Sequence, residues 1–333
     1  MRIALDVMGG DHAPTNPIEG AKLALESLPQ LERLYLVGEP EVVEAALQAA
    51  QLRDRRIEVV PASQVIAMTD ASTDALRAKK DSSISVAVDL VRSGECSAIV
   101  SAGHTGASVA AATVRLKRLR GIDRPGIASP LPNEFGMANI VDAGANPEAK
   151  PQHLFQYAIM GHVYARQVLH RERPIIGLMS IGEEDEKGTE LTREVFRMLK
   201  QTDLNFRGNI EGHDLFETQL DVVVCDGFTG NVLLKACEAT AKVMFKWIKA
   251  EIHRSTPLRK LGALMARDSF RKVKERGNYE TYGGSPLLGV NGVVIIGHGS
   301  SSALAIKNAI RVATEAVRHE LNPHIEAEVA RLS

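Results

Sequence analysis

The segment Ser101-Ala-Gly-His-Thr-Gly-Ala107 follows a short apolar run, 97–100, and precedes a segment rich in Ala, Val and Thr, 107–116. This order predicts a buried strand, a glycine-containing turn and a helix. Glycine lets the backbone approach a ligand closely, and the N–H groups at the start of a helix attract anions. The segment therefore indicates either an anion site or an ordinary turn between a strand and a helix.

Five other predicted strands end in similar loops, rich in Gly, Asp, Asn or His. These loops contain Met8-Gly-Gly-Asp-His12, Asp142-Ala-Gly-Ala-Asn146, Ile181-Gly-Glu-Glu-Asp-Glu-Lys-Gly188, Asp226-Gly-Phe-Thr-Gly-Asn231 and Gly297-His-Gly-Ser-Ser301. The alternation of strands and helices predicts an α/β fold with a mostly parallel, doubly wound sheet. Because parallel strands end on one edge of a sheet, we expect all six loops to meet there at one site for an anionic ligand. The alternative is a set of unrelated turns.

Composition narrows the class of protein. The chain has 333 residues, with 40 Lys and Arg against 41 Asp and Glu, a balance that favours no nucleic-acid partner. The three cysteines lack the spacing of a zinc site, and we expect them to be reduced, as in the cytosol. We find no secretory leader and no apolar run long enough to span a membrane. We therefore expect a protein that is soluble or peripheral to a membrane and is not exported.

Several kinds of site are disfavoured. The chain has no P-loop motif, and the glycines after Asp6 lack the spacing of a dinucleotide-binding turn. His12, His104 and His298 would meet if the loops converge, but no close pair has metal-ligand spacing, so we expect no metal and no cofactor. The acidic run 183–186 is expected to be solvated rather than to hold Mg²⁺. Cys225 is expected to be a buried thiol rather than a nucleophile.

The ordered set of loops, together with Tyr282-Gly-Gly-Ser-Pro-Leu-Leu-Gly289, resembles the PlsX-type phosphate acyltransferases of bacterial phospholipid synthesis. The resemblance extends over the whole chain, and the order of the motifs makes it specific. One departure is His104, where the family usually has Asn. The backbone amides around that position are unaffected by the difference.

The resemblance implies an activity. It implies transfer of a long-chain acyl group from acyl-carrier protein to inorganic phosphate, without a cofactor, giving acyl phosphate for a downstream glycerol-3-phosphate acyltransferase. It also implies a three-layer α/β/α fold like that of phosphotransacetylases and isocitrate dehydrogenase, and a homodimer. We expect the protein in the cytoplasm, peripherally associated with the inner face of the cell membrane, as argued below from the arm. The alternatives are a short-chain acyl-CoA phosphotransferase, a related dehydrogenase, and a non-catalytic, membrane-docked binding protein.

We assign candidate site residues within this framework. Asn231 or His298 is expected to donate to the oxyanion of the intermediate, Lys187 or Lys80 to bind phosphate, and Asp11 and Asp226 to orient these groups. The proposed catalytic residues are Lys187, Asn231, His298 and Asp226. The proposed phosphate- and substrate-binding residues are Gly9, Gly10, Asp11, Lys80, Ser82, Ser101, Gly103, His104, Thr105, Gly106 and Asn146. For the cations and hydroxyls between Arg77 and Ser83, a solvated surface is the alternative.

One stretch, 232–276, does not fit the sheet, although we expect residues 1–333 to form one α/β unit, with or without two lobes. A helix from Val232 to about Arg254, a break at Thr256-Pro257 and a second helix to about Arg276 predict a helical hairpin arm. Val243, Phe245, Trp247 and Ile248 are expected to form a dimer surface. Residues 254–276 contain eight Lys or Arg against two acidic residues. With the apolar residues Leu258, Leu261, Leu264 and Met265, these cations predict a tip that contacts an anionic membrane. The alternatives are packing of the leucines on the partner helix and contact of the cations with acidic carrier protein.

Overall fold

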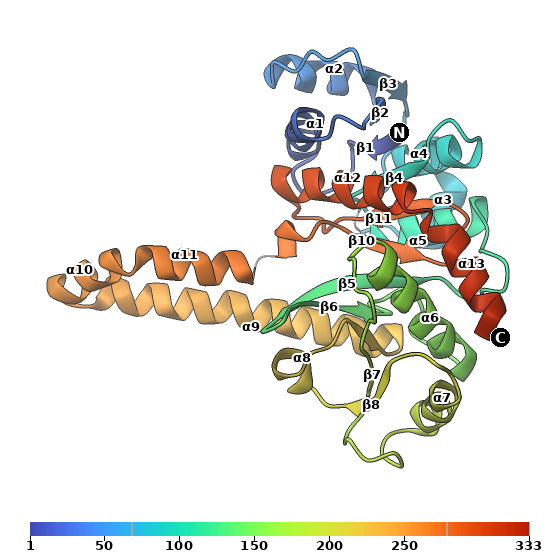
Figure 1. Cartoon of the computed structure of the whole chain (residues 1–333). Helices are drawn as coiled ribbons and strands as arrows, with labels where there is room; N and C mark the ends of the chain where they lie inside the picture. The colour runs from blue at the N-terminus through green and yellow to red at the C-terminus, as the bar shows by residue number, and fades with distance from the viewer. Residues whose placement is uncertain (68, 278, 333) are drawn as a thin grey trace.

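A computed structural model of the chain describes residues 1–67, 69–277 and 279–332, and one long sheet runs through it (Figure 1). The strands are β1 (Arg2–Asp6), β2 (Arg33–Gly38), β3 (Ile57–Pro61), β4 (Ala98–Ser101), β5 (Gly126–Asn133), β6 (Gly136–Val141), β7 (Ile176–Met179), β8 (Phe206–Ile210), β9 (Val222–Val224), β10 (Ser285–Leu288) and β11 (Val293–Ile296). The helices are α1 (Thr15–Ser27), α2 (Pro40–Ala49), α3 (Ser72–Ala78), α4 (Ser83–Arg92), α5 (Thr105–Arg115), α6 (Pro151–Gln167), α7 (Glu190–Lys200), α8 (Asp214–Glu217), α9 (Gly227–Arg254), α10 (Pro257–Met265), α11 (Arg267–Arg276), the 3₁₀ turn η1 (Tyr279–Thr281), α12 (Ala303–Arg318) and α13 (Leu321–Leu332).

The sheet has 11 strands in the order β3-β2-β1-β4-β11-β10-β5-β6-β9-β7-β8. Strand β10 is antiparallel to both β11 and β5, and β5 is antiparallel to β6. Three reversals therefore separate two parallel groups: β3, β2, β1, β4 and β11 run in one direction, and β6, β9, β7 and β8 run in the other. The prediction of a mostly parallel α/β sheet is confirmed.

The prediction that all six loops lie on one edge is wrong. The loops after β1, β4 and β11 lie on one edge of the sheet, and the loops after β6, β7 and β9 lie on the opposite edge. The cause is the antiparallel pairing of β5 with β6: the reversals at β11–β10 and β10–β5 cancel, so β5 runs in the direction of β1, β4 and β11, and β6 runs in the other. The sequence analysis also missed one strand. Strand β10, with Pro286 and flanking glycines, looks like a loop in the sequence, but pairing with β11 and β5 holds it in the sheet.

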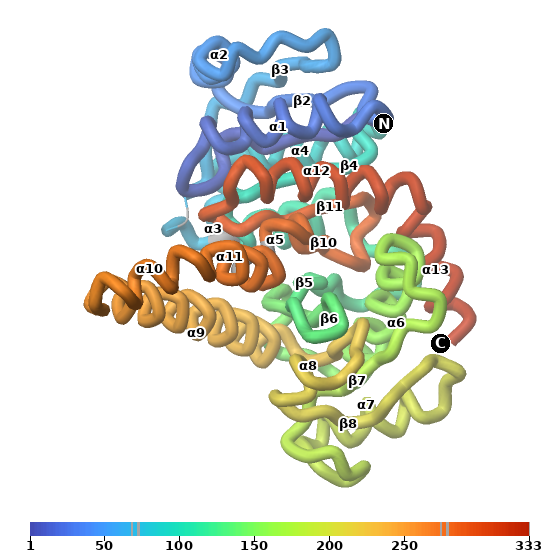
Figure 2. Tube along the Cα trace, turned by 60° about the vertical axis from the view of Figure 1, so that its left-hand side comes forward, coloured from blue at the N-terminus to red at the C-terminus, as the bar shows by residue number. Residues whose placement is uncertain are grey.

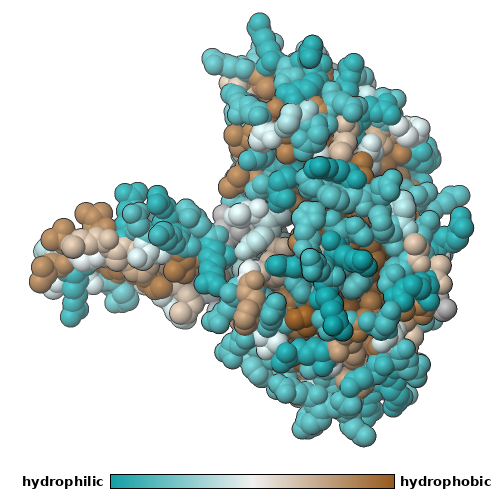
Figure 3. All heavy atoms as spheres, in the orientation of Figure 1, coloured by the Kyte–Doolittle hydropathy of each residue, from teal (hydrophilic) through white to brown (hydrophobic). Residues whose placement is uncertain are grey.

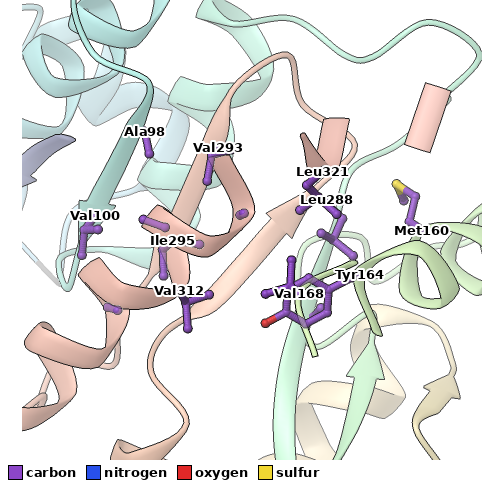
Figure 4. Close-up of a cluster of buried hydrophobic side chains, with 14 of the residues drawn as sticks. Ala98, Val100, Met160, Tyr164, Val168, Leu288, Val293, Ile295, Val312 and Leu321 are labelled. Atoms are coloured by element: carbon purple, nitrogen blue, oxygen red, sulfur yellow. The ribbon is translucent and has the colours of Figure 1, made fainter. Parts of the chain in front are cut away.

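The two halves share one hydrophobic core. Helices α1, α12, α6 and α13 cover one face of the sheet with a continuous cluster of buried side chains, and α4 and α5 cover the opposite face of the first half. Val100 and Ile295 of the sheet lie near Val312 of α12, while Tyr164 of α6 and Leu321 of α13 belong to the same cluster (Figure 4). Because this packing crosses the point where the strands reverse, it holds the two halves together.

Helices α9, α10 and α11 form an arm that projects from the body (Figures 1 and 2). Helix α9 ends at Arg254 and α10 begins at Pro257, at the break expected from Thr256-Pro257. The returning leg differs from the prediction in being two helices, α10 and α11, which meet at Ala266. Among the helices of the described residues, none combines the length and apolar composition needed to cross a bilayer.

Candidate functional site

A cleft of about 1310 Å³ lies between the body and the root of the arm. Its floor is β5, including Ser129 and Leu131, and its sides are α9, α11 and α8. The loops after β4 and β11 line one end with Thr105 and His298. The cleft thus lies over the stretch of sheet where the strands reverse.

At the first edge, three loops that are far apart in the sequence pack together. A Cβ atom added to Gly9 would lie 2.6 Å from the backbone nitrogen of Gly103, so only glycine allows this approach. The amide of Asp11 donates to the carbonyl of Gly299 at 2.7 Å. These contacts bring the loops after β1, β4 and β11 to the same end of the cleft.

Asp6, the last residue of β1, fixes the loops at that edge through hydrogen bonds to its side chain. Its carboxylate is buried and accepts hydrogen bonds from the Ser101 hydroxyl at 2.7 Å and the Met8 amide at 3.1 Å. Burial raises the pKa of Asp6, although these hydrogen bonds favour its ionised form. The Ser101 hydroxyl in turn accepts from the Gly103 amide at 3.1 Å. Asp6 and Ser101 therefore shape the loop from inside.

Asp142 has the same role at the second edge. Its buried carboxylate accepts four backbone hydrogen bonds, from Ile127 at 2.9 Å, Gly144 at 3.0 Å, Ala145 at 2.9 Å and Asn146 at 2.6 Å. Burial raises its pKa, and the four amides oppose that shift. One side chain thus holds the whole turn after β6.

Helix α9 connects the two edges. The carboxylate of Asp226 caps its first turn, accepting from the amide and the hydroxyl of Thr229 at 2.9 and 2.7 Å. Gly227 and Gly230 are its only buried residues. A Cβ atom on Gly230 would lie 2.0 Å from the carbonyl oxygen of Asp142. Asn231 is the next residue in α9, so its position in the cleft depends on the close packing of Gly230 against the carbonyl of Asp142.

One turn further along α9, Lys235 reaches the opposite edge. Its Nζ atom lies 3.0 Å from Nε2 of His298, and Nδ1 of His298 lies 2.8 Å from the Ser300 hydroxyl. An ammonium cannot accept a hydrogen bond, so a neutral ring accepts from Lys235 at Nε2, and Nδ1 also lies 3.2 Å from the backbone amide of Ser300. Burial lowers the pKa of His298, and the charge of Lys235 lowers it further. Both effects favour that neutral ring.

Four of the residues that we assigned from sequence line the cleft: Asp11, Thr105, Asn231 and His298. The others lie elsewhere. Gly9, Gly10 and Gly103 pack loop against loop, Ser101 bonds to Asp6, and His104 caps α5 while its Nε2 lies 3.0 Å from the carbonyl of Asp70. Gly106 lies in the first turn of α5, which begins at Thr105.

Four more of those residues lie outside the cleft lining for structural reasons. Ser82 is buried and caps α4, and Lys80 is exposed just before it. The side-chain amide of Asn146 donates to Tyr157 at 3.2 Å and lies 3.1 Å from His153. Lys187 is exposed in the loop after β7, on the second edge of the sheet. Asn231 belongs to a loop on the same edge but lines the cleft, because α9 runs from that loop toward His298.

The sequence analysis missed Lys235, Asp6 and Asp142. The signal for Lys235 was available, because it lies four residues after Asn231 on a predicted helix and so shares its face. Asp6 and Asp142 both end a predicted strand, but Asp6 also accepts from the hydroxyl of the distant Ser101, and Asp142 from the amide of Ile127 in the neighbouring strand. Burial of these carboxylates could not be inferred from the local sequence.

Replacing Lys235 with glutamine is expected to raise the pKa of His298, because the nearest positive charge is removed. Proton NMR titration of the histidine ring resonances measures this change, and loss of one resonance in His298→Gln assigns it. Lys187→Gln is the control and should leave the titration of His298 unchanged. An unaltered His298 titration in Lys235→Gln would contradict the contact.

Comparisons with known proteins agree with this architecture. The family model of the fatty acid synthesis protein family matches residues 1–323. The chain is 52% identical to a phosphate acyltransferase of Akkermansia muciniphila, over 100% of this chain and 97% of the relative. It is 49% identical to a phosphate acyltransferase of Geobacter sulfurreducens, over 98% of this chain and 93% of the relative.

Among solved structures, a phosphotransacetylase of Streptococcus pyogenes has a TM-score of 0.64 at 18% identity, over 96% of this chain and 94% of that one. A branched-chain phosphotransacylase of Enterococcus faecalis has a TM-score of 0.58 at 14% identity, over 95% and 99%. These likenesses establish the shared fold. From the sequence matches, the chain belongs to the fatty acid synthesis protein family, the family of the relatives named phosphate acyltransferase.

Proposed function

We propose that this protein transfers an acyl group from the thioester of acyl-carrier protein to inorganic phosphate. The observation that supports this most is a cleft in which cationic and hydrogen-bonding groups adjoin a long apolar wall. The names of the relatives agree with the proposal. The alternative substrates, short-chain acyl-CoA thioesters, would leave most of the apolar wall unused.

Phosphate is proposed to bind at the start of α5. Among the described residues, the backbone amides of Thr105 and Gly106 donate to no protein acceptor. The partial positive charge of a helix N-terminus favours an anion there. Lys235 and Lys242 of α9 line the same cleft and supply positive charge. We therefore assign phosphate to the space between Thr105 and Lys235.

The proposed chemistry is direct displacement. A phosphate oxygen attacks the thioester carbonyl, forming a tetrahedral intermediate whose oxyanion accepts a hydrogen bond from the side-chain amide of Asn231. The C–S bond then breaks, and the carrier leaves as a thiolate that takes up a proton. His298 holds the Lys235 ammonium toward the phosphate through the 3.0 Å contact. No electrons are transferred between substrates, so the proposal includes no redox cofactor.

The function is tested by following carrier thiol released from palmitoyl-carrier protein with and without phosphate. We expect release that depends on phosphate, with acyl phosphate as the product. The same assay with acetyl-CoA and palmitoyl-CoA separates a short-chain phosphotransferase from a long-chain enzyme. Absence of phosphate-dependent release with every thioester would refute the proposed activity and favour a binding protein.

Asn231→Ala is expected to lower kcat about 100-fold, because the oxyanion loses one hydrogen-bond donor. Lys187→Ala, by contrast, should retain wild-type kinetics, since Lys187 lies outside the cleft lining. Rates of acyl phosphate formation, with folding checked by circular dichroism, measure both effects. Full activity of Asn231→Ala would remove this residue from the mechanism.

We also propose that the protein is a homodimer joined through α9. Val243, Met244 and Trp247 are exposed on the side of α9 away from the cleft, and the side chain of Trp247 is 61% exposed. Phe245 and Ile248, which we grouped with them from sequence, line the cleft instead. Large exposed apolar patches are uncommon on monomers. The dimer surface therefore consists of Val243, Met244 and Trp247.

The tip of the arm is proposed to contact the inner face of the cytoplasmic membrane. Helix α10 has no buried residue, and Leu258 and Met265 are 79% and 81% exposed. Apolar surface is visible at the outer end of the arm (Figure 3). Arg259 and Lys260 lie beside these side chains and attract anionic lipids. A peripheral enzyme of this kind would release its acyl phosphate next to the downstream glycerol-3-phosphate acyltransferase.

The double substitution Leu261→Glu with Leu264→Glu is expected to abolish sedimentation with anionic liposomes and to leave soluble catalysis largely intact. The added charges oppose burial of the tip in the lipid surface. Ile181→Glu, at a side chain that is 77% exposed on the body, is the matched control and should still sediment. Undiminished sedimentation of the double variant would disprove the membrane contact.

A further inference from the structure

The cleft side of α9 carries apolar side chains along most of its length, with Lys242, Lys249 and His253 between them. Leu234, Phe245, Ile248 and Ile252 line the cleft and recur at the spacing of one helix face. These side chains are distinct from the outward residues Val243, Met244 and Trp247, which lie on the other side of the helix. Helix α9 therefore has two apolar faces, and a dimer contact on the outer face leaves the inner one open.

Three other elements form the facing wall. Leu131 of β5, Phe216 of α8 and Phe270 of α11 line the same cleft. Helix α11 runs back along α9 from the tip of the arm (Figure 1), so Phe270 encloses the part of the cleft that is far from His298. The result is a groove with apolar side chains on both sides.

The groove is long and has room for a large ligand. From Leu234 to Ile252, α9 advances about 27 Å at ~1.5 Å per residue. The volume of about 1310 Å³ exceeds the roughly 300–1,000 Å³ of ordinary small-molecule pockets. The groove therefore accommodates an extended ligand rather than a compact one.

One end of the groove is polar. Asn231, Lys235 and His298 lie there, and Lys235 follows Leu234 directly. A ligand with an anionic or carbonyl head and a long apolar tail matches this division, with its head at Lys235 and its tail along α9. Asp11 and Glu238 are the carboxylates of the described residues that line the cleft, and Lys242, Lys249 and His253 line it farther along α9.

We propose that the acyl chain of the substrate extends from the Lys235–His298 contact along the inner face of α9, and that Ile248 and Phe270 determine the accepted chain length. This inference rests on the proposed acyl transfer to phosphate. A short chain occupies only the segment near Leu234. A long chain also occupies the segment enclosed by Ile248, Ile252 and Phe270.

The test is Ile248→Trp, which fills the distal groove. Each buried methylene strengthens binding about fourfold, so loss of three of them lowers the ratio of kcat/KM for palmitoyl over octanoyl thioester about 60-fold. Activity with octanoyl thioester should stay near that of the wild type. Glu251→Trp, an exposed position outside the cleft lining, is the matched control and should leave the ratio unchanged.

Cys237 provides a measurement that needs no variant and no turnover. It lines the cleft and is partly exposed, whereas Cys96 and Cys225 are buried. Palmitoyl-CoA and octanoyl-CoA, each without phosphate, should both slow alkylation of Cys237, because Cys237 lies within one turn of Leu234, in the segment that either chain occupies. This protection decides whether the acyl chain enters the groove if Ile248→Trp does not fold.

The outcomes separate the two proposals. Wild-type protein without phosphate-dependent release for any chain length would refute the acyltransferase activity. An active wild type, with an unchanged palmitoyl-to-octanoyl ratio in Ile248→Trp, would refute the groove assignment alone. Equal alkylation of Cys237 with and without palmitoyl-CoA would refute it as well.

Discussion

Gly230→Ala is expected to lower kcat/KM for acyl transfer at least about 1,000-fold. The added Cβ atom would lie 2.0 Å from the carbonyl oxygen of Asp142, a backbone atom that cannot turn away. The first turn of α9 must then move, and Asn231 and Lys235 move with it. In the proposed mechanism Asn231 stabilises the oxyanion and Lys235 binds the phosphate that attacks the thioester carbonyl. Displacing both side chains therefore lowers kcat/KM more than displacing either one alone.

Gly262→Ala is the matched control for that substitution. Gly262 is also helical, in α10, but an added Cβ atom meets nothing within 4 Å. Alanine should stabilise that helix by about 0.5–1 kcal/mol and leave kcat/KM unchanged. Steady-state kinetics of the two variants, with folding checked by circular dichroism, measure the difference. Wild-type kinetics for Gly230→Ala would show that the start of α9 does not position the site.

Asp142→Ala is expected to lower the free energy of unfolding by at least about 3 kcal/mol. The four backbone amides that donate to this carboxylate lose their acceptor, and each unsatisfied buried donor costs about 1–3 kcal/mol. Gly144 is exposed, so water replaces part of the loss there. The turn after β6, on which Gly230 packs, should loosen at the same time.

Urea unfolding measures this change in stability. Asp142→Asn keeps one acceptor oxygen and should lose less stability than the alanine variant. Asp185→Ala is the control, because Asp185 is exposed and its contact with Lys200 is 3.9 Å long. Removing such a surface pair should change the free energy of unfolding by no more than about 0.5 kcal/mol. Equal stability of Asp142→Ala and Asp185→Ala would contradict the proposed role of Asp142.

Much of the candidate site was within reach of sequence analysis. Asp11, Thr105, Asn231 and His298 were chosen because glycine-rich loops follow strands, and all four line one cleft. Lys187 was chosen by the same rule but lies outside the cleft lining, although its loop is on the same edge as that of Asn231. The rule identifies loops at strand ends, but it contains no information on which of these loops a helix such as α9 connects to the cleft.

The sequence analysis also failed to identify two buried carboxylates that shape the site. Asp6 and Asp142 look like ordinary turn residues, yet each carboxylate is buried and accepts hydrogen bonds from its turn. Asp6 also accepts a hydrogen bond from Ser101 of β4, 95 residues later in the chain, and Asp142 accepts one from Ile127 of the neighbouring strand β5. Such partners become neighbours only when the strands pair.

By itself the sequence determined the alternation of strands and helices, the break at Thr256-Pro257 and the family of the chain. These properties depend on local periodicity, on proline and glycine geometry, and on ordered motifs. Only the tertiary structure decided that β10 joins the sheet, that β6, β7 and β9 run opposite to β1 and β4, and that α9 crosses between the edges. The physical reason is that a strand's direction is set by hydrogen bonds to its neighbours, and β10 finds those neighbours in β11 and in β5, which lies more than 150 residues earlier in the chain.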